Sequence, residues 1–388
     1  MQQPSPKKRI EFIDLLRGWA VIVMIQTHVF NATLTPATTG SGFFEVIRFI
    51  DGLVAPSFLF ASGMAYAVTT RRKMADYLSF GTPLVRQVGR LLFIMLIGYS
   101  LHIPRFNYYH LRYEAGATAW QVFWQSDVLQ CIAASLLFLQ AMLLVLRSET
   151  RLYRTMIGVT AAVVLATPLV WGQDFWQVMP VPLASFMNGL HFSLFPLFPW
   201  SAFLFAGALT GYYYLRARDE QERLPDAVPT MMKRALLAGA ACIALSFVLH
   251  PLAERIYPTY DYWKFSPSFY LLRLGLVMLL CGGLYFYENR AGVSARSVVA
   301  LMGRESLLVY TTHLLLVYGK FGPFTFTDRV HQSFTYPEAI LTTLVLFLLM
   351  YALALVWSRI KTSPPPWKRA TQLVVLGCFV LVFFFGPN

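Results

Sequence analysis

Charged residues are scarce in this sequence. They make up 13% of the 388 residues, whereas a soluble globular domain carries about 25%. Hydrophobic residues make up 57% and aromatic residues 16%, and the mean hydropathy is +0.54. This shortage of charge excludes an ordinary soluble domain and indicates a chain surrounded mostly by lipid. Apolar runs recur from end to end, so residues 1–388 are interpreted as one membrane domain.

Cysteine and the common catalytic motifs are also lacking. The four cysteines are spread over separate apolar segments, without metal spacing or evident pairing; they are Cys131, Cys242, Cys281 and Cys378. The sequence contains no phosphate-binding glycine-rich loop, HExxH or GxSxG element. No resident metal is therefore expected. The spacing Gly207-x-x-x-Gly211 is interpreted as a surface for close helix packing.

Acidic residues are outnumbered by basic ones, 19 to 32, which gives a net charge of +13. With the N-terminus placed inside and successive segments alternating sides, 22 of the 32 Lys and Arg residues fall in cytoplasmic segments and seven in outer loops. This positive-inside distribution predicts a cytoplasmic N-terminus. The basic charge therefore indicates topology, and we expect membrane lipids rather than nucleic acid as partners.

About eleven apolar segments, within a range of ten to twelve, are predicted to cross the membrane. Each has roughly 20 mostly apolar residues between polar, proline or glycine breaks. The predicted fold class is an all-α polytopic helix bundle. The predicted spans are 12–31, 45–69, 88–104, 126–146, 155–172, 194–215, 235–252, 268–287, 298–318, 338–357 and 370–386. The last span follows a triple proline and is expected to lie outside a core of residues 9–360.

The first predicted helix carries a polar stripe. At 100° per residue, Asp14, Arg17 and His28 share one face with Val21 and Met24. Because ionisable groups are costly in lipid, this face should point toward the bundle interior or a wet cavity. The alternative is a structural pair between Asp14 and Arg17, with His28 as a buried histidine that has its own partner.

Three histidines lie inside predicted helices: His28, His102 and His313. The predicted topology places all three in the outer half of the membrane. Histidine is the side chain best suited to proton transfer near neutral pH, so these residues are candidate catalytic groups. Buried ionisable groups also mark transport paths. A transporter or flippase for a polar solute or lipid-linked sugar is therefore the rival hypothesis.

The ordered motifs of the chain resemble those of the multi-pass membrane acyltransferases. Arg9, Asp14, Arg17 and Gly18, with His28 ten residues after the glycine, are similar to the opening of that superfamily. Further segments resemble the branch related to heparan-α-glucosaminide N-acetyltransferase and its bacterial relatives, and the likeness runs from about residue 9 to 320. These segments are 55–60 with Gly63, 98–104, 127–132, 195–200 with Gly207 and Gly211, and 266–269.

The resemblance implies transfer of an acetyl or other acyl group from cytosolic acetyl-CoA to an acceptor across the membrane. For a bacterial member, it implies an envelope glycan or amino sugar as acceptor, the inner (plasma) membrane as location, and allows a homodimer. In the animal enzyme, the proposed active histidine lies in the loop after the first helix. The corresponding residues 32–44 contain no histidine here. The general membrane O-acyltransferases place a histidine where His28 stands, so we expect His28 to be the essential one.

Acyl transfer needs a base for the acceptor proton and donors for the developing oxyanion. His28 is predicted to be the base, or a nucleophile that holds the acyl group. Asp51 or Asp127 is predicted to orient an imidazole, a role that a backbone carbonyl also suits. His102 or Gln130 is predicted to donate to the oxyanion.

Four further residues complete the candidate site. Arg17 and Arg90 lie at cytoplasmic helix ends and are predicted to bind the phosphates of coenzyme A. Asp14 and His313 are candidate catalytic residues because the stripe and the helix interior contain them. For Arg90 the alternative is a positive-inside charge, and for Asp127 it is a helix N-cap.

Overall fold

Helices dominate the computed structural model, which describes residues 9–294, 296–319, 326–364 and single positions between 370 and 385. Within these residues there is no β-strand, only an isolated bridge between Leu34 and Phe334. The predicted all-α class is confirmed. The predicted last span, 370–386, lies largely outside the described residues.

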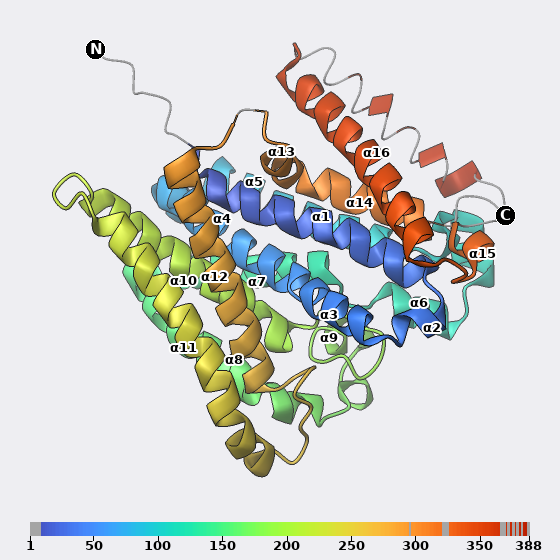
Figure 1. Cartoon of the computed structure of the whole chain (residues 1–388), viewed down its shortest axis with the longest axis horizontal. Helices are drawn as coiled ribbons and strands as arrows, with labels where there is room; N and C mark the ends of the chain where they lie inside the picture. The colour runs from blue at the N-terminus through green and yellow to red at the C-terminus, as the bar shows by residue number, and fades with distance from the viewer. Residues whose placement is uncertain are drawn as a thin grey trace.

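Helix α1 (Glu11–Thr33) runs through the middle of the molecule (Figure 1). Its most extensive contacts are with five other helices. These are α4 (Val54–Leu78), α12 (Pro267–Ala291), α13 (Val298–Arg304), α14 (Ser306–Tyr318) and α16 (Tyr336–Thr362). The predicted stripe faces this surrounding bundle, because Asp14, Val21 and Met24 are all buried. A central position suits a helix that carries ionisable groups.

Glycines bring α1 and α13 into backbone contact. A Cβ on Gly18 would lie 1.9 Å from the carbonyl oxygen of Val299. A Cβ on Gly303 would lie 1.8 Å from the carbonyl oxygen of Asp14. Only glycine allows two helices to approach this closely in a membrane bundle. These contacts fix the N-terminal half of α1 against α13.

A second glycine crossing joins α4 to α10 (Leu197–Glu220). A Cβ on Gly63 would lie 1.9 Å from the Leu204 carbonyl oxygen, and one on Gly207 would lie 2.0 Å from the Phe60 carbonyl oxygen. A Cβ on Gly211 would lie 3.0 Å from Met64. The Gly207-x-x-x-Gly211 spacing therefore serves close packing, as predicted.

The remaining helices surround these crossings. Helix α5 packs on α7, α8 packs on α10, and α11 packs on α12 along one side of the molecule (Figure 1). Their bounds are Thr82–Ser100 for α5, Val128–Leu146 for α7, Glu149–Trp171 for α8 and Ala227–Ile256 for α11. Short helices lie in the connections: α2 (Pro36–Thr39), α3 (Gly42–Asp51), α6 (Ala117–Phe123), α9 (Val181–Ala184) and α15 (Phe326–Val330).

Six of the described helices are long and apolar enough to cross a membrane: α1, α7, α8, α11, α12 and α16. Helix α14 is apolar but shorter. The six helices support a membrane-spanning bundle. The total of about eleven crossings and the cytoplasmic N-terminus stay predictions.

Two predicted spans are broken in the structure. Residues 45–69 form α3 and α4, which are separated at Gly52 and Leu53. Residues 298–318 form α13 and α14, which are separated at Glu305. Glu305 is buried and its carboxylate accepts a hydrogen bond from Lys361 of α16 at 2.5 Å. Lys361 is 56 residues from Glu305 in the sequence, so local hydropathy did not indicate this contact at the break.

We predict that Gly18→Ala or Gly303→Ala destabilises the protein by about 1–3 kcal/mol or more, because the new methyl group meets backbone atoms that have no free rotamer. Thermal unfolding in detergent measures this as a lower melting temperature. Gly283→Ala is the matched control, since no atom lies within 4 Å of its Cβ position. Equal melting temperatures for the three variants would show that the crossing tolerates a side chain.

Candidate functional site

A cavity of about 700 Å³ lies at the C-terminal end of α1. Residues from α1, the α3–α4 junction, α5, α7, α10 and α14 line it. Its polar side chains are Thr27, His28, Asn31, Asp51, His102 and Asp127, and its aromatic side chains are Phe58, Phe195, Trp200, Tyr310 and Tyr318. Four predicted site residues, His28, Asp51, His102 and Asp127, therefore meet in one cavity.

Tyr318 determines which nitrogen of His28 carries the proton. The Tyr318 hydroxyl donates to the backbone carbonyl oxygen of His28 at 3.1 Å. The Nδ1 atom of His28 lies 3.3 Å from the same hydroxyl oxygen. Because the hydroxyl proton is already used, Nδ1–H is the donor and Nε2 keeps its lone pair. His28 is thus held as a neutral imidazole whose Nε2 carries no proton, and the residue lines the cavity.

His313 packs beside His28 but is fully buried. The two ring centroids are 5.2 Å apart. The Nδ1–H of His313 donates to the Val309 carbonyl oxygen at 2.8 Å, and its buried Nε2 has no hydrogen-bond partner. His313 does not line the cavity. It supports the His28 ring from behind as a second neutral imidazole.

His102 and Asp127 form a pair on the opposite wall. The Nδ1–H of His102 donates to the Gly98 carbonyl oxygen at 2.9 Å, and Nε2 lies 3.6 Å from Asp127 Oδ2. The same carboxylate oxygen accepts the hydroxyl proton of Tyr310 at 3.3 Å. His102 is therefore held by a backbone carbonyl on one ring nitrogen and lies beside a carboxylate on the other.

Asp127 is also the N-cap of α7. Its Oδ1 accepts the backbone N–H of Val128 at 2.7 Å. Ser126 joins this point to residues 193–195, because its N–H donates to Ser193 Oγ at 3.0 Å and its hydroxyl donates to the Phe195 carbonyl oxygen at 2.9 Å. Asp127 therefore has both roles considered in the sequence analysis. Its Oδ1 caps α7, and its Oδ2 faces His102.

Asp51 is the last residue of α3, a short helix that is not among the six candidate spans. Burial raises the pKa of Asp51 to about 6, and a hydrogen bond from Thr27 opposes the shift in part. Its Oδ1 is buried without a hydrogen-bond partner. Asp51 is therefore a carboxylate at neutral pH that retains free acceptor capacity at the cavity.

Gln130 lies behind the cavity wall rather than in it. Its side chain is fully buried on α7, and neither amide atom has a hydrogen-bond partner. It packs against Gly98, where a Cβ would lie 2.6 Å from Gln130 Oε1. The carbonyl of Gly98 is the one that holds His102. Gln130 thus contacts the segment that orients His102.

The other end of the stripe is arranged differently from the predicted alternative. Asp14 accepts a hydrogen bond from Arg9 Nη2 at 3.1 Å, so its ion pair is with Arg9 and not with Arg17. Within the described residues, Arg17 has no carboxylate partner. Arg90 is exposed near the N-terminal half of α5. None of these four residues lines the cavity around His28.

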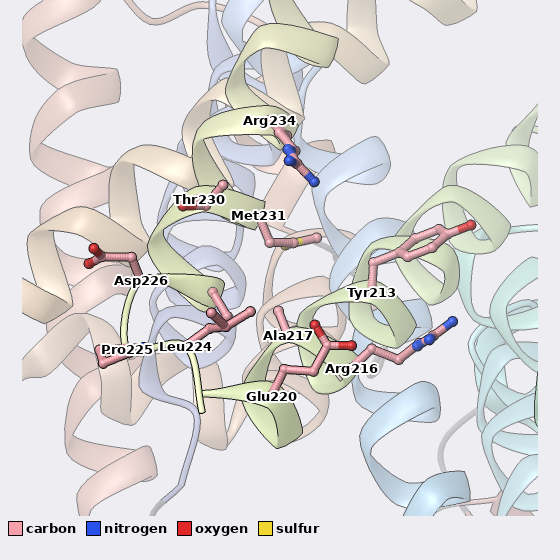
Figure 2. A pocket seen from close by; sticks show the side chains of 11 residues that line it. Tyr213, Arg216, Ala217, Glu220, Leu224, Pro225, Asp226, Thr230, Met231 and Arg234 are labelled. Atoms are coloured by element: carbon pink, nitrogen blue, oxygen red, sulfur yellow. The ribbon is translucent and has the colours of Figure 1, made fainter. Parts of the chain in front are cut away.

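A separate hollow of about 470 Å³ lies between the end of α10 and the start of α11 (Figure 2). Its side chains include Arg216 and Arg234, together with the acidic Glu220 and Asp226. Opposite charges in one open hollow compensate each other, so it has no strong preference for an anion. Neither Arg17 nor Arg90 lines it.

The sequence analysis missed the tyrosines of α14. Tyr310 and Tyr318 are eight residues apart on α14, about 80° from each other around the helix axis, and the hydroxyls of both bind polar groups of the site. Spacing that brings them to one face of a helix was a usable signal. Trp200 belongs to the motif 195–200, but the sequence analysis did not single it out, because aromatic residues are frequent throughout the chain.

Comparison with known families gives one match. The family model described as heparan-alpha-glucosaminide N-acetyltransferase, catalytic, matches residues 9–252, which is well over half of the chain. A search of curated proteins finds no match. The matched region contains His28, Asp51, His102 and Asp127, whereas α12, α13 and α14 lie beyond it.

We predict that a cysteine at Asn31, an exposed residue of the cavity, reacts with a membrane-impermeant thiol reagent only from the outer side. The reason is the positive-inside distribution, which places this end of α1 outside. Labelling of right-side-out and inside-out vesicles measures it in a background without native cysteines. Ser79→Cys is the control. Ser79 caps the end of α4 that lies away from the cavity, and the cysteine there should react only in inside-out vesicles. The reverse pattern would invert the predicted topology.

Proposed function

The chain belongs to the heparan-alpha-glucosaminide N-acetyltransferase catalytic family, and from this we propose that it moves an acetyl group from cytosolic acetyl-CoA to an amino-sugar or glycan acceptor at the outer side of a bacterial inner membrane. The single observation that carries the proposal is the neutral His28, which has an unprotonated Nε2 and lines a cavity with two carboxylates and several aromatic rings. A base beside a polar, partly aromatic cavity is what acetyl transfer to a sugar requires.

His28 acts as the general base in this proposal. Its Nε2 accepts the proton that the acceptor nitrogen or oxygen loses as it forms the new bond to the acetyl carbon. The carbon–sulfur bond of the thioester breaks, coenzyme A leaves as its thiolate, and the proton on His28 passes to that sulfur or to water. The Tyr318 hydroxyl and the buried His313 ring hold the imidazole in this orientation. A histidine whose tautomer and ring plane are both fixed transfers a proton more efficiently than one that is free to rotate.

The charge of the cavity supports an amine acceptor. Asp51 and Asp127 are its carboxylates, and no Lys or Arg is among the described residues that line it. Asp127 faces His102, which leaves Asp51 as the carboxylate free to attract a protonated amine. Trp200 and Phe195 provide flat apolar surfaces of the kind that pack against sugar rings.

We assign His102 to the stabilisation of the negative charge that develops on the acetyl oxygen. The Gly98 carbonyl oxygen holds its Nδ1–H, and its Nε2 lies 3.6 Å from Asp127 Oδ2. Groups that are fixed in position stabilise an oxyanion because they need no reorganisation as the charge develops. Gln130 contributes by fixing the Gly98 segment and not by touching the acceptor.

Acetyl-CoA would supply an acetyl group activated as a thioester. Arg17 fits its phosphates best among the predicted residues, because it lies within α1 and has no carboxylate partner in the described part of the chain. A planar guanidinium is suited to a phosphate group. Asp14 does not compete, since Arg9 already neutralises it.

We predict that His28→Ala lowers acetyl transfer from acetyl-CoA to an amino sugar by about 100-fold or more, the usual contribution of a general base. Purified protein and a radiolabelled acetyl group measure the rate. His110→Ala is the control, because His110 pairs with Glu114 outside the cavity. If wild type moves a solute across vesicles but never consumes acetyl-CoA, the transporter hypothesis replaces this one.

We predict that Asp51→Asn raises the KM for an amine acceptor about tenfold, the loss of one charge-assisted hydrogen bond, and leaves the KM for a hydroxyl acceptor unchanged. Because burial raises the pKa of Asp51 to about 6, the carboxylate is ionised above that pH and neutral below it. The wild-type KM for the amine should therefore rise as pH falls through 6, and the variant should lack this rise. Identical pH profiles would contradict the role of Asp51.

A further inference from the structure

Arg273 is a buried cation on α12, one of the candidate spans. The residue is 5% exposed, and no ion pair joins it to a carboxylate in the described part of the chain. Burying an unneutralised guanidinium costs several kcal/mol, and such residues inside a membrane domain usually have a functional reason. The contacts of its guanidinium indicate that reason.

The guanidinium binds the end of α3. Its Nη1–H donates to the Phe49 carbonyl oxygen in the last turn of that helix. It lies 4.5 Å from the ring centroid of Phe49 and 5.6 Å from that of Phe269. A cation at a helix C-terminus is favoured by the helix dipole, and the two ring faces provide cation–π contacts.

The same guanidinium fills the space beside Gly52. A Cβ at Gly52 would lie 2.6 Å from Arg273 Nη2 and 2.7 Å from its Cζ. Asp51 and Gly52 both line the cavity around His28, whereas Arg273 does not. Arg273 therefore supports the corner between α3 and α4 from behind the cavity wall.

The segment Ser266–Phe269, one of the motifs in the sequence, positions this support. The Ser266 hydroxyl accepts the Phe269 N–H at 2.8 Å and caps α12. The Phe269 ring packs on Arg273 and lies 6.1 Å from the ring of Trp200, which lines the cavity. The start of α12 thus contacts the cavity wall at two places, through Arg273 and through Phe269.

We propose that Arg273 is a positioning residue that fixes the Asp51 carboxylate on the cavity side by holding the Phe49 carbonyl and packing against Gly52. The effect of Arg273 on catalysis rests on the proposed function of Asp51 as the binding group for an amine acceptor. The effect of Arg273 on the geometry of the α3–α4 corner is independent of that proposed function. The two parts are tested separately.

The kinetic test compares Arg273→Met and Arg273→Lys with Asp51→Asn. Arg273→Met should raise the KM for an amine acceptor about tenfold, as loss of one charge-assisted contact would, and change kcat less than about threefold. Arg273→Lys should fall between wild type and Arg273→Met, because it keeps the charge and loses the planar fork. The double variant with Asp51→Asn should show no further increase, since both changes act on one contact.

A merely structural role predicts a different result. The amount of folded protein or kcat would then fall with KM unchanged, or the effects of the two substitutions on KM would multiply. Thermal unfolding in detergent provides the folding control, because it shows whether each variant keeps the stability of wild type. A fall in kcat or in the amount of folded protein with KM unchanged, or effects on KM that multiply, would overturn the proposal.

The geometric test needs no activity. In a background without native cysteines, Asp51→Cys should react with a small charged thiol reagent at a rate that changes about fivefold or more when Arg273→Met is added, because access to a thiol follows its orientation. Equal rates would overturn the positioning role. If wild type transfers no acetyl group but the rates differ, the proposed function fails and the positioning of Asp51 by Arg273 stands.

Discussion

The backbone contact between α1 and α13 is the constraint on which the site depends. Gly18 and Gly303 remove the side chains that would hold the two helices apart. Because α14 follows α13 directly, this contact also brings the Tyr318 hydroxyl to His28. Residues 290 positions apart in the sequence therefore share one hydrogen-bond network. A wider crossing would separate His28 from the hydroxyl that sets its tautomer.

Polar groups inside an apolar bundle must be paired or must face water, and the two ends of α1 meet this requirement differently. At the N-terminal end, Arg9 neutralises Asp14. At the C-terminal end, His28 and Asp51 retain unused acceptor capacity beside a cavity. Paired charges are suited to structure and unpaired acceptors to binding. The chemistry is therefore expected at the histidine end.

Local patterns predicted much of this arrangement and missed what depends on distant partners. Hydropathy located most long helices, and the 100° periodicity placed Asp14, Val21 and Met24 on the buried face of α1. The break before α4 was not predictable, because the Arg273 that binds its edge is 224 residues from Phe49 in sequence. The pairing of Asp14 with Arg9 was missed because helical spacing favoured Arg17, although Arg9 lies in the same motif.

The extent of the family match bears on how the acceptor is chosen. Residues 9–252 match the acetyltransferase family and supply His28, Asp51, His102 and Asp127. The side chains that orient these groups, Tyr310, Tyr318 and Arg273, come from α12 and α14, beyond the match. A substitution in these later helices changes the direction of a polar group without changing its identity. On the proposed function, these later helices set the angle at which Asp51 and His28 face the cavity, and that angle decides which acceptor reaches His28.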